Sequence, residues 1–138
     1  MRKVLVAGFI VLSATLALGQ QWQIIKSVNL TQQSQSIPLT TLLTPSAPGS
    51  YRIGFYFSES GGQSPTAPNY YEATLTGQDI TGQPDVIDTP LSCKAPIWES
   101  AQQIISLKAG VPLTYAVNAS GSPSQCTYNL TITVEQLL

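Results

Sequence analysis

Apolar and polar side chains alternate almost without interruption along residues 126–135, near the C-terminal end of the sequence. A period of two residues is typical of a β-strand with one buried face, so this segment predicts such a strand. Its core-facing side should hold the apolar positions Cys126, Tyr128, Leu130, Ile132 and Val134. The other side holds Thr127, Asn129, Thr131, Thr133 and Glu135. We expect this polar side to be solvated; the alternative is that its hydroxyl groups bind a sugar or a flat surface.

The same alternation recurs along the chain and predicts further strands at residues 21–31, 36–45, 51–60, 70–79, 102–110 and 111–120. The segment 51–60 alternates most cleanly and is expected at the centre of a sheet, with an outward side made of Arg52, Gly54, Tyr56 and Ser58. Pro38 favours an edge position for its strand, because proline has no N–H to donate to a neighbour. Residues 80–96 are expected to be mostly a connection, and residues 98–105 could form one helical turn.

Seven or eight short strands separated by turn signals, with no convincing helical period, predict an all-β protein with an antiparallel β-sandwich. A jelly roll is favoured over an immunoglobulin-like arrangement. In immunoglobulin domains a disulfide joins two strands and packs against a core tryptophan. Here Cys93 falls in a predicted loop and Cys126 begins the last strand. The immunoglobulin-like alternative stays open at this point.

The N-terminus has the organisation of a secretory signal. Arg2 and Lys3 precede an uncharged run of 16 residues from Val4 to Gly19. Such a run is shorter than the roughly 20 apolar residues that span a bilayer. We therefore predict a signal peptide at residues 1–19 and a secreted or extracytoplasmic protein of one domain, residues 20–138, with no membrane span in the mature chain.

Charge is scarce in residues 20–138, which contain four basic and seven acidic side chains. Nucleic acid is excluded as a partner, because phosphate binding needs a basic face that four scattered cations do not provide. The same scarcity argues against binding to anionic membrane surfaces. The expected partners are therefore glycans or proteins.

The chain has two cysteines, Cys93 and Cys126, and export would take them to a compartment where disulfides persist. We predict that they pair, which would close a loop of 33 residues. In the chain-entropy model such a bond contributes on the order of 3–4 kcal/mol to stability. A zinc site would need more ligands than two cysteines in a chain without histidine. Redox catalysis is disfavoured because the two cysteines lack a Cys-x-x-Cys spacing.

The sequence does not predict an enzyme. It lacks histidine, the commonest general base. A glycosidase would need two carboxylates roughly 5–10 Å apart. The candidates, which lie near turn residues, are Glu59, Glu72, Asp79, Asp85 and Asp88. Calcium bound by Asp79, Asp85 and Asp88 is the metal alternative, but solvated surface acids are the favoured interpretation, so no cofactor and no metal is predicted.

The run IPLTTLLTPSAPGSYRIGFYF, a strand followed by a Pro-Gly turn and an aromatic alternating strand, resembles the middle of the globular heads in the complement and tumour necrosis factor superfamily. IISLKAGVPLTYAV is similar to the strand, glycine turn and strand that follow in those heads, and CTYNLTITVEQLL to their closing strand. The resemblance covers residues 37–138 and implies a jelly-roll recognition module that forms homotrimers. The sequence departs from the family at Val111, which follows Gly110 where those heads commonly carry an acidic residue, so no metal site is carried over.

The leading functional hypothesis is an exported, non-catalytic binding module that holds a glycan or protein partner with surface loops such as residues 60–69. Its candidate ligand contacts are Tyr56, Asn69 and Tyr70. The alternative is a structural subunit of a cell-surface, fibre or capsid-like assembly, which the scarcity of charge would allow. A small hydrolase is the third hypothesis.

Three Asn-x-Ser/Thr sequons begin at Asn29, Asn118 and Asn129, all on predicted outward positions. In a eukaryotic secretory pathway they are candidate glycosylation sites. In a bacterial one they are chance matches in a sequence rich in asparagine and threonine. The sequence leaves both interpretations open.

Overall fold

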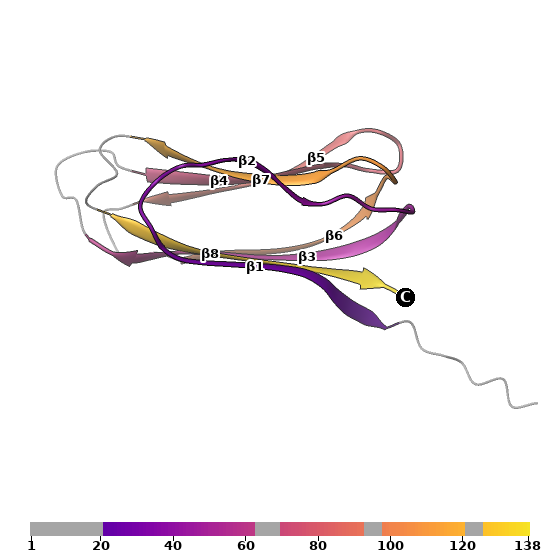
Figure 1. The fold of residues 1–138 in the computed structure, drawn as a ribbon, viewed down its shortest axis with the longest axis horizontal. Coiled ribbons are helices and arrows are strands. Elements are labelled where there is room, and N and C mark those ends of the chain that lie inside the picture. The colour runs from indigo at the N-terminus through magenta and orange to yellow at the C-terminus, as the bar shows by residue number, and fades with distance from the viewer. Residues whose placement is uncertain (1–20, 63–69, 93–97, 121–125) are drawn as a thin grey trace, which may run out of the picture.

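The computed structural model describes residues 21–62, 70–92, 98–120 and 126–138, which form eight β-strands (Figure 1). The strands are β1 (Trp22–Gln33), β2 (Ile37–Leu43), β3 (Gly49–Gly61), β4 (Tyr70–Gln78), β5 (Pro84–Ser92), β6 (Trp98–Leu107), β7 (Leu113–Ser120) and β8 (Thr127–Leu137). No helix in this part of the chain is long and apolar enough to cross a membrane. The signal peptide expected at residues 1–19 lies outside the described residues and stays a prediction.

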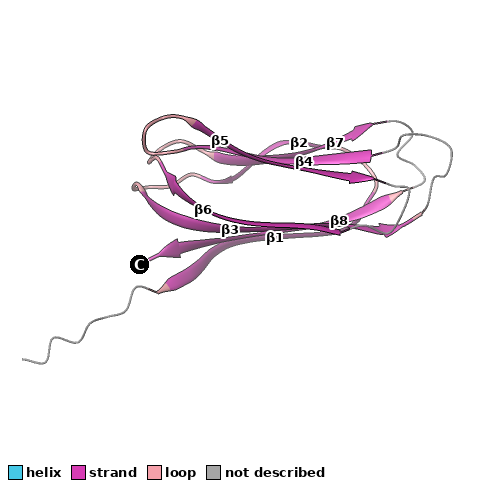
Figure 2. Ribbon diagram, turned by 180° about the vertical axis from the view of Figure 1, so that it is seen from behind, coloured by secondary structure: helices cyan, strands magenta, loops and turns pink. Residues whose placement is uncertain are grey.

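The strands form two four-stranded antiparallel sheets that lie face to face as two layers (Figures 1 and 2). One sheet has the order β1-β8-β3-β6 and the other the order β2-β7-β4-β5. Each strand of the first half of the chain pairs with its counterpart from the second half: β1 with β8, β2 with β7, β3 with β6 and β4 with β5. This nested pairing is the jelly-roll form of the sandwich, so the predicted fold class is confirmed.

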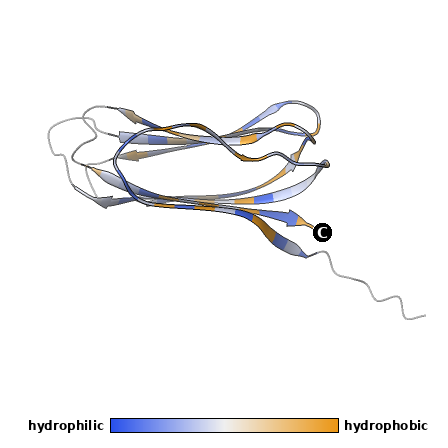
Figure 3. Ribbon diagram, viewed as in Figure 1, coloured by the Kyte–Doolittle hydropathy of each residue, from blue (hydrophilic) through white to orange (hydrophobic). Residues whose placement is uncertain are grey.

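The core lies between the two sheets and follows from the alternation along each strand. All five core-facing residues predicted in and just before β8 are buried, as are the four alternating apolar residues of β3. Figure 3 shows apolar and polar positions following one another along the ribbons. β3 lies between β8 and β6, as expected for a central strand, and β2, which contains Pro38, is an edge strand.

Three aromatic rings anchor one end of the core. The ring of Tyr128 lies 4.5 Å from that of Tyr71 and 5.2 Å from that of Phe57, measured between centroids. The hydroxyl group of Tyr71 donates to the main-chain oxygen of Cys126, and that of Tyr128 to the main-chain oxygen of Gln35, both at 2.8 Å. Buried tyrosines are stable here because each polar tip has a hydrogen-bond partner.

Residues 80–96, predicted to be mostly a connection, contain the edge strand β5. The error came from Pro84 and Pro90, which argue against a strand with two neighbours. The main-chain N–H of Asp79 donates to the oxygen of Gln83 at 2.9 Å, at the hairpin turn. The alternation of an antiparallel ladder then directs the nitrogens of both prolines away from β4, toward the open edge of the sheet. Neither proline removes a hydrogen bond from the sheet.

The helical turn considered for residues 98–105 is also wrong, because this segment belongs to β6. The two-residue alternation of apolar and polar side chains in β6 is broken at two positions. Gln103 lies on the inward side and its amide donates to the Asp85 carboxylate of the other sheet at 3.1 Å. Ile104 lies on the outward side and is 62% exposed. The two residues reverse the usual pattern of apolar inside and polar outside.

Candidate functional site

The outward side of the sheet β1-β8-β3-β6 carries rows of side chains that cross several strands. Residues paired in an antiparallel ladder point to the same side, so the register places Thr133, Gly54 and Gln102 in one row. The next row consists of Thr131, Tyr56 and Ser100. The polar side of β8 thus becomes part of a wider surface shared with β3 and β6.

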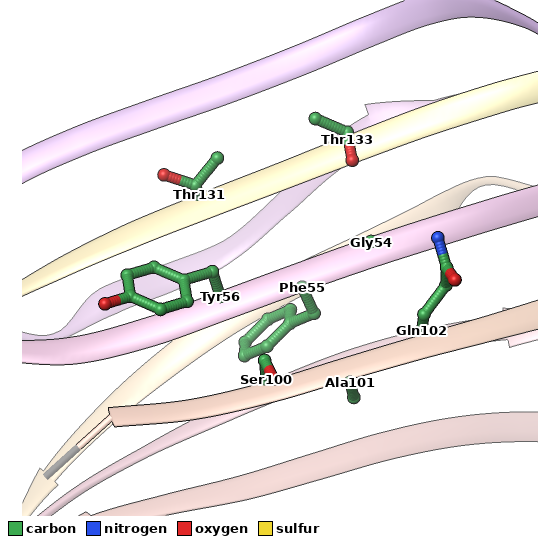
Figure 4. Close-up of a pocket in the computed structure, with 8 residues that line it drawn as sticks. All are labelled: Gly54, Phe55, Tyr56, Ser100, Ala101, Gln102, Thr131 and Thr133. Carbon is green, nitrogen blue, oxygen red and sulfur yellow. The ribbon is translucent and has the colours of Figure 1, made fainter.

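A hollow of about 270 Å³ lies where these two rows meet (Figure 4). It is lined by Gly54, Phe55, Tyr56, Ser100, Ala101, Gln102, Thr131 and Thr133. The space exists because residue 54 has no side chain: a β-carbon there would come within 2.6 Å of the hydroxyl oxygen of Thr133. A glycine inside a strand often marks a place where a ligand or another backbone approaches closely.

One exposed aromatic side chain lines the hollow, and a second lies on the same face of the sheet. Tyr56 lines it and is 43% exposed, and Trp98 is 65% exposed. Trp98 pairs with Ser58, two positions from the partner of Tyr56, so the two rings occupy diagonal positions on the same face. Diagonal neighbours across antiparallel strands lie about 7–8 Å apart, within reach of aromatic side chains. The face therefore offers one ring at the polar depression and a second exposed ring at a diagonal position on the same face.

The charges on this face compensate one another. The Arg52 guanidinium forms an ion pair with the Glu135 carboxylate through Nε and lies over the Trp22 ring, 4.9 Å from its centroid. The hydrogen bond from Arg52 holds the pKa of the Glu135 carboxyl below its usual range. The rows that line the hollow hold hydroxyl, amide and aromatic groups. The arrangement suits a neutral polar ligand.

The two tyrosines proposed as ligand contacts lie on different sheets. Tyr56 is on the outward side of β3, whereas Tyr70 begins β4 and faces outward from the other sheet, where it is 42% exposed. Asn69 lies outside the described residues, as does most of the loop at residues 60–69. The structure therefore does not bring the three candidate contacts to one face.

Most of the remaining predicted sites lie among the described residues, but one of the two cysteines does not. Cys126 is buried, and its expected disulfide partner Cys93 lies outside the described residues, so the disulfide stays a prediction. Asn29 and Asn118 are exposed, on β1 and β7. Asn129 is partly buried, and its side-chain oxygen accepts a hydrogen bond from the main-chain N–H of Gln32 at 3.0 Å.

The acidic side chains have separate structural roles. The carboxylate of Asp79 accepts hydrogen bonds from the hydroxyl of Thr81 at 2.7 Å and from the main-chain N–H of Gln83 at 2.8 Å, which lower its pKa. Burial raises the pKa of Glu59. Within the described part of the chain, no three acidic or cysteine side chains form a group that could hold a metal ion, so Asp79, Asp85 and Asp88 do not make the calcium site considered above.

Several residues of the hollow were not among the predicted contacts. Ser100 and Gln102 join Gly54 and Tyr56 of β3 only through the pairing of β3 with β6. Thr133 joins them only through the pairing with β8, and the sequence offered it only as part of a polar side that could bind a sugar. The sequence carried one signal, a glycine on the outward side of the cleanest strand, next to an outward tyrosine. Without the strand order, the sequence could not show which residues of other strands lie beside this glycine and tyrosine.

No protein-family model and no curated protein matches the chain. Among solved structures, the CBM22-1 xylan-binding domain from Paenibacillus barcinonensis Xyn10C is 14% identical, with a TM-score of 0.38 over 86% of this chain and 81% of that one. A pentameric capsid protein from metagenomic phage sequences is 10% identical, with a TM-score of 0.40 over 98% and 82%. A carbohydrate-binding module, CBM6cm-2, from Cellvibrio mixtus lichenase 5A, solved with cellotriose, is 19% identical, with a TM-score of 0.30 over 85% and 86%. None of these similarities carries a function over to this chain.

Proposed function

We propose that the protein is an exported, non-catalytic module that binds a neutral glycan on the outward side of the sheet β1-β8-β3-β6. The observation that carries the proposal is the hollow over Gly54, which is bordered by an exposed tyrosine and lined by hydroxyl and amide groups. The binding surface is thus the polar side of β8 together with its neighbours, and not the loops alone.

The chemistry of a sugar ring matches the two kinds of group on this face. A pyranose has an apolar C–H face, which can pack on an aromatic ring, and a rim of hydroxyl groups. Tyr56 and Trp98 offer exposed rings for the first. Thr131, Thr133 and Gln102 offer donors and acceptors for the second. Ligand sites commonly combine an apolar surface with a small number of placed polar groups.

The electrostatics favour a neutral ligand over an anionic one. The guanidinium of Arg52 is already paired with Glu135, so it is not available as an uncompensated positive charge. A charged glycan would meet no other cation in the rows that line the hollow. Neutral polysaccharides are therefore the ligand class to test.

Three alternatives compete with glycan binding on this face. Glycosylation at Asn29 or Asn129 would cover the same face, because Asn29 pairs with Thr131 and Asn129 with Ser58 on its outward side. A protein partner held by Tyr70 would use the opposite sheet. The structural-subunit alternative is favoured by one observation, the open edge of β6 among the described strands.

Affinity electrophoresis against a panel of neutral polysaccharides tests the proposal. Tyr56→Ala should weaken binding at least about tenfold, as expected for an aromatic hot spot. Tyr70→Ala is the matched control, since the two tyrosines are equally exposed on opposite sheets, and it should bind like the wild type. A loss confined to Tyr70→Ala would move the site to the other sheet. Failure of the wild type to bind any neutral polysaccharide would overturn the glycan proposal.

A further inference from the structure

Three of the four edge strands of the sandwich carry features that hinder pairing with another chain. β1 is interrupted at Ile25 and again near Gln32, whose φ is +53°. β2 contains Pro38 and two register shifts. β5 contains two prolines whose nitrogens face its open edge. Bulges and prolines of this kind protect sheet edges from further strand addition.

β6 is the exception. It pairs with β3 over ten consecutive residues without a register shift, and it contains no proline and no lysine. Its far end is covered, since Ile80 N donates to Ser106 O at 2.9 Å and Lys108 N donates to Gln78 O at 3.1 Å. No other described segment pairs with the open side of β6.

The two hydrogen bonds at the covered end also reveal which main-chain groups face the open edge. Ser106 directs its oxygen away from β3, so by alternation the same is true of every second residue before it. These residues are Trp98, Ser100, Gln102 and Ile104. Their N–H and C=O groups form an unbroken row of donors and acceptors along the edge.

The sequence of this row is complementary to itself. Trp98 and Ile104, the two large apolar residues, are 65% and 62% exposed and lie at equal distances on either side of Ala101. Antiparallel pairing about Ala101 would place each of them opposite the other in a second copy. Ser100 would meet Gln102, and Glu99, the one charged residue of the strand, would meet Gln103 instead of another carboxylate.

We propose that a second copy of this chain pairs with β6 in antiparallel orientation, with the two-fold axis at Ala101. The register makes hydrogen-bonded pairs of Trp98 with Ile104 and of Ser100 with Gln102, each occurring twice by symmetry. The outward side gains two contacts between an indole ring and a branched aliphatic side chain. Because the other edges are protected, growth stops at a dimer.

The dimer would join the two outward faces into one eight-stranded surface. From a strand spacing of about 4.8 Å and a rise of about 3.4 Å per residue, the two hollows over Gly54 would lie roughly 16 Å apart on the same side. One extended ligand chain could then touch both, which would raise its apparent affinity through effective concentration. The pairing itself does not depend on the ligand, so it can fail or succeed independently of the proposed function.

Light scattering after size exclusion, over a range of protein concentrations and without ligand, tests the proposal. The purified protein should shift from monomer to dimer as its concentration rises. A monomer at every concentration would overturn the proposal. A trimer, as implied by the resemblance to complement and tumour necrosis factor heads, would overturn it as well and point to a different interface.

Two variants identify the interface if a dimer is found. Ile104→Glu should raise the concentration at the midpoint of dimerisation at least about tenfold, because two cross-strand contacts are lost and two carboxylates are added. Val86→Glu, at an exposed branched residue of β5 on the other sheet, should leave the midpoint unchanged. Equal effects of both variants would overturn the assignment to β6.

Hydrogen exchange gives a readout that needs no variant. The amides of Ser100, Gln102 and Ile104 should exchange more slowly as the dimer forms, since they donate across the two-fold axis. The amide of Ala101, which already faces β3, should change little. Unchanged exchange at the first three amides in a dimeric sample would place the contact elsewhere and overturn the proposal.

Discussion

The hydroxyl oxygen of Thr133 lies 2.6 Å from the point where a β-carbon would stand at Gly54. The two residues are paired across β8 and β3, and the absence of a side chain on one lets the other border an open depression. The β-carbon of Thr133 lies 4.0 Å from the same point, which is ordinary contact distance. A β-carbon at residue 54 would therefore clash with one atom, the hydroxyl oxygen of Thr133.

This geometry predicts the behaviour of Gly54→Ala. The added methyl group collides with Thr133 and should destabilise the fold by about 1–3 kcal/mol, the usual cost of overpacking. The double variant Gly54→Ala, Thr133→Ala removes the oxygen and should recover most of that loss in urea denaturation. If the double variant is as unstable as the single one, the clash is not the cause.

The ion pair between Arg52 and Glu135 predicts a dependence of stability on acid. Because the pKa of Glu135 is lower in the folded state, the pair stabilises the fold above the unfolded carboxyl pKa of about 4.3 and is lost as the pH falls through the lower folded value. Glu135→Gln should therefore be less stable than the wild type at pH 7. The difference between the two should shrink in denaturation curves measured below pH 4.3 or so, and a constant difference would contradict the assignment.

Glu59 should affect the pH dependence of stability in the opposite direction from Glu135. Burial raises the pKa of Glu59, so the folded state binds the proton more tightly than the unfolded chain does, and stability falls as the pH rises from the unfolded pKa through the higher folded pKa. Glu59→Gln should raise the melting temperature at pH 7 and have less effect near pH 4, close to the unfolded pKa. Glu72→Gln, on the outward side of β4, is the control and should change the melting temperature little. A lower melting temperature for Glu59→Gln would show that the carboxylate stabilises the fold.

The disulfide predicted between Cys93 and Cys126 can be tested chemically. Alkylation of the unfolded, unreduced protein should modify no thiol, as judged by intact mass. Reduction should lower the free energy of unfolding by about 3–4 kcal/mol, the amount expected for closure of a loop of this length. Two alkylated thiols before reduction would rule the bond out.

The alternation of side chains was enough to predict β3, β4, β7 and β8, because each of them is buried on one side only. It failed for Pro84–Ser92, where prolines at an open edge resemble the prolines of a loop. It also failed to place Trp98 in a strand, since Gln103 and Ile104 reverse the pattern around it.

The candidate site was less accessible to sequence reasoning than the fold. Tyr56 could be assigned to an outward face, but Gln102 and Thr133 are separated from Gly54 by 48 and 79 positions in the sequence. Their meeting depends on strand order and register, which a period of two residues does not encode. Only the pairing of β3 with both β6 and β8 makes one surface of the three segments.

The interior position of β8 has a consequence for the order of events during folding. β8 lies between β1 and β3, and Trp22 is paired with Leu137, so the first strand has no partner until the last one is available. Contacts this distant in sequence require the closure of long loops, and proteins rich in them fold on the scale of milliseconds to seconds. A chain that crosses a membrane pore from its N-terminus would leave this sheet incomplete until its final residues had emerged. The outward face of the sheet β1-β8-β3-β6 is therefore complete only once β8 has taken its place between β1 and β3.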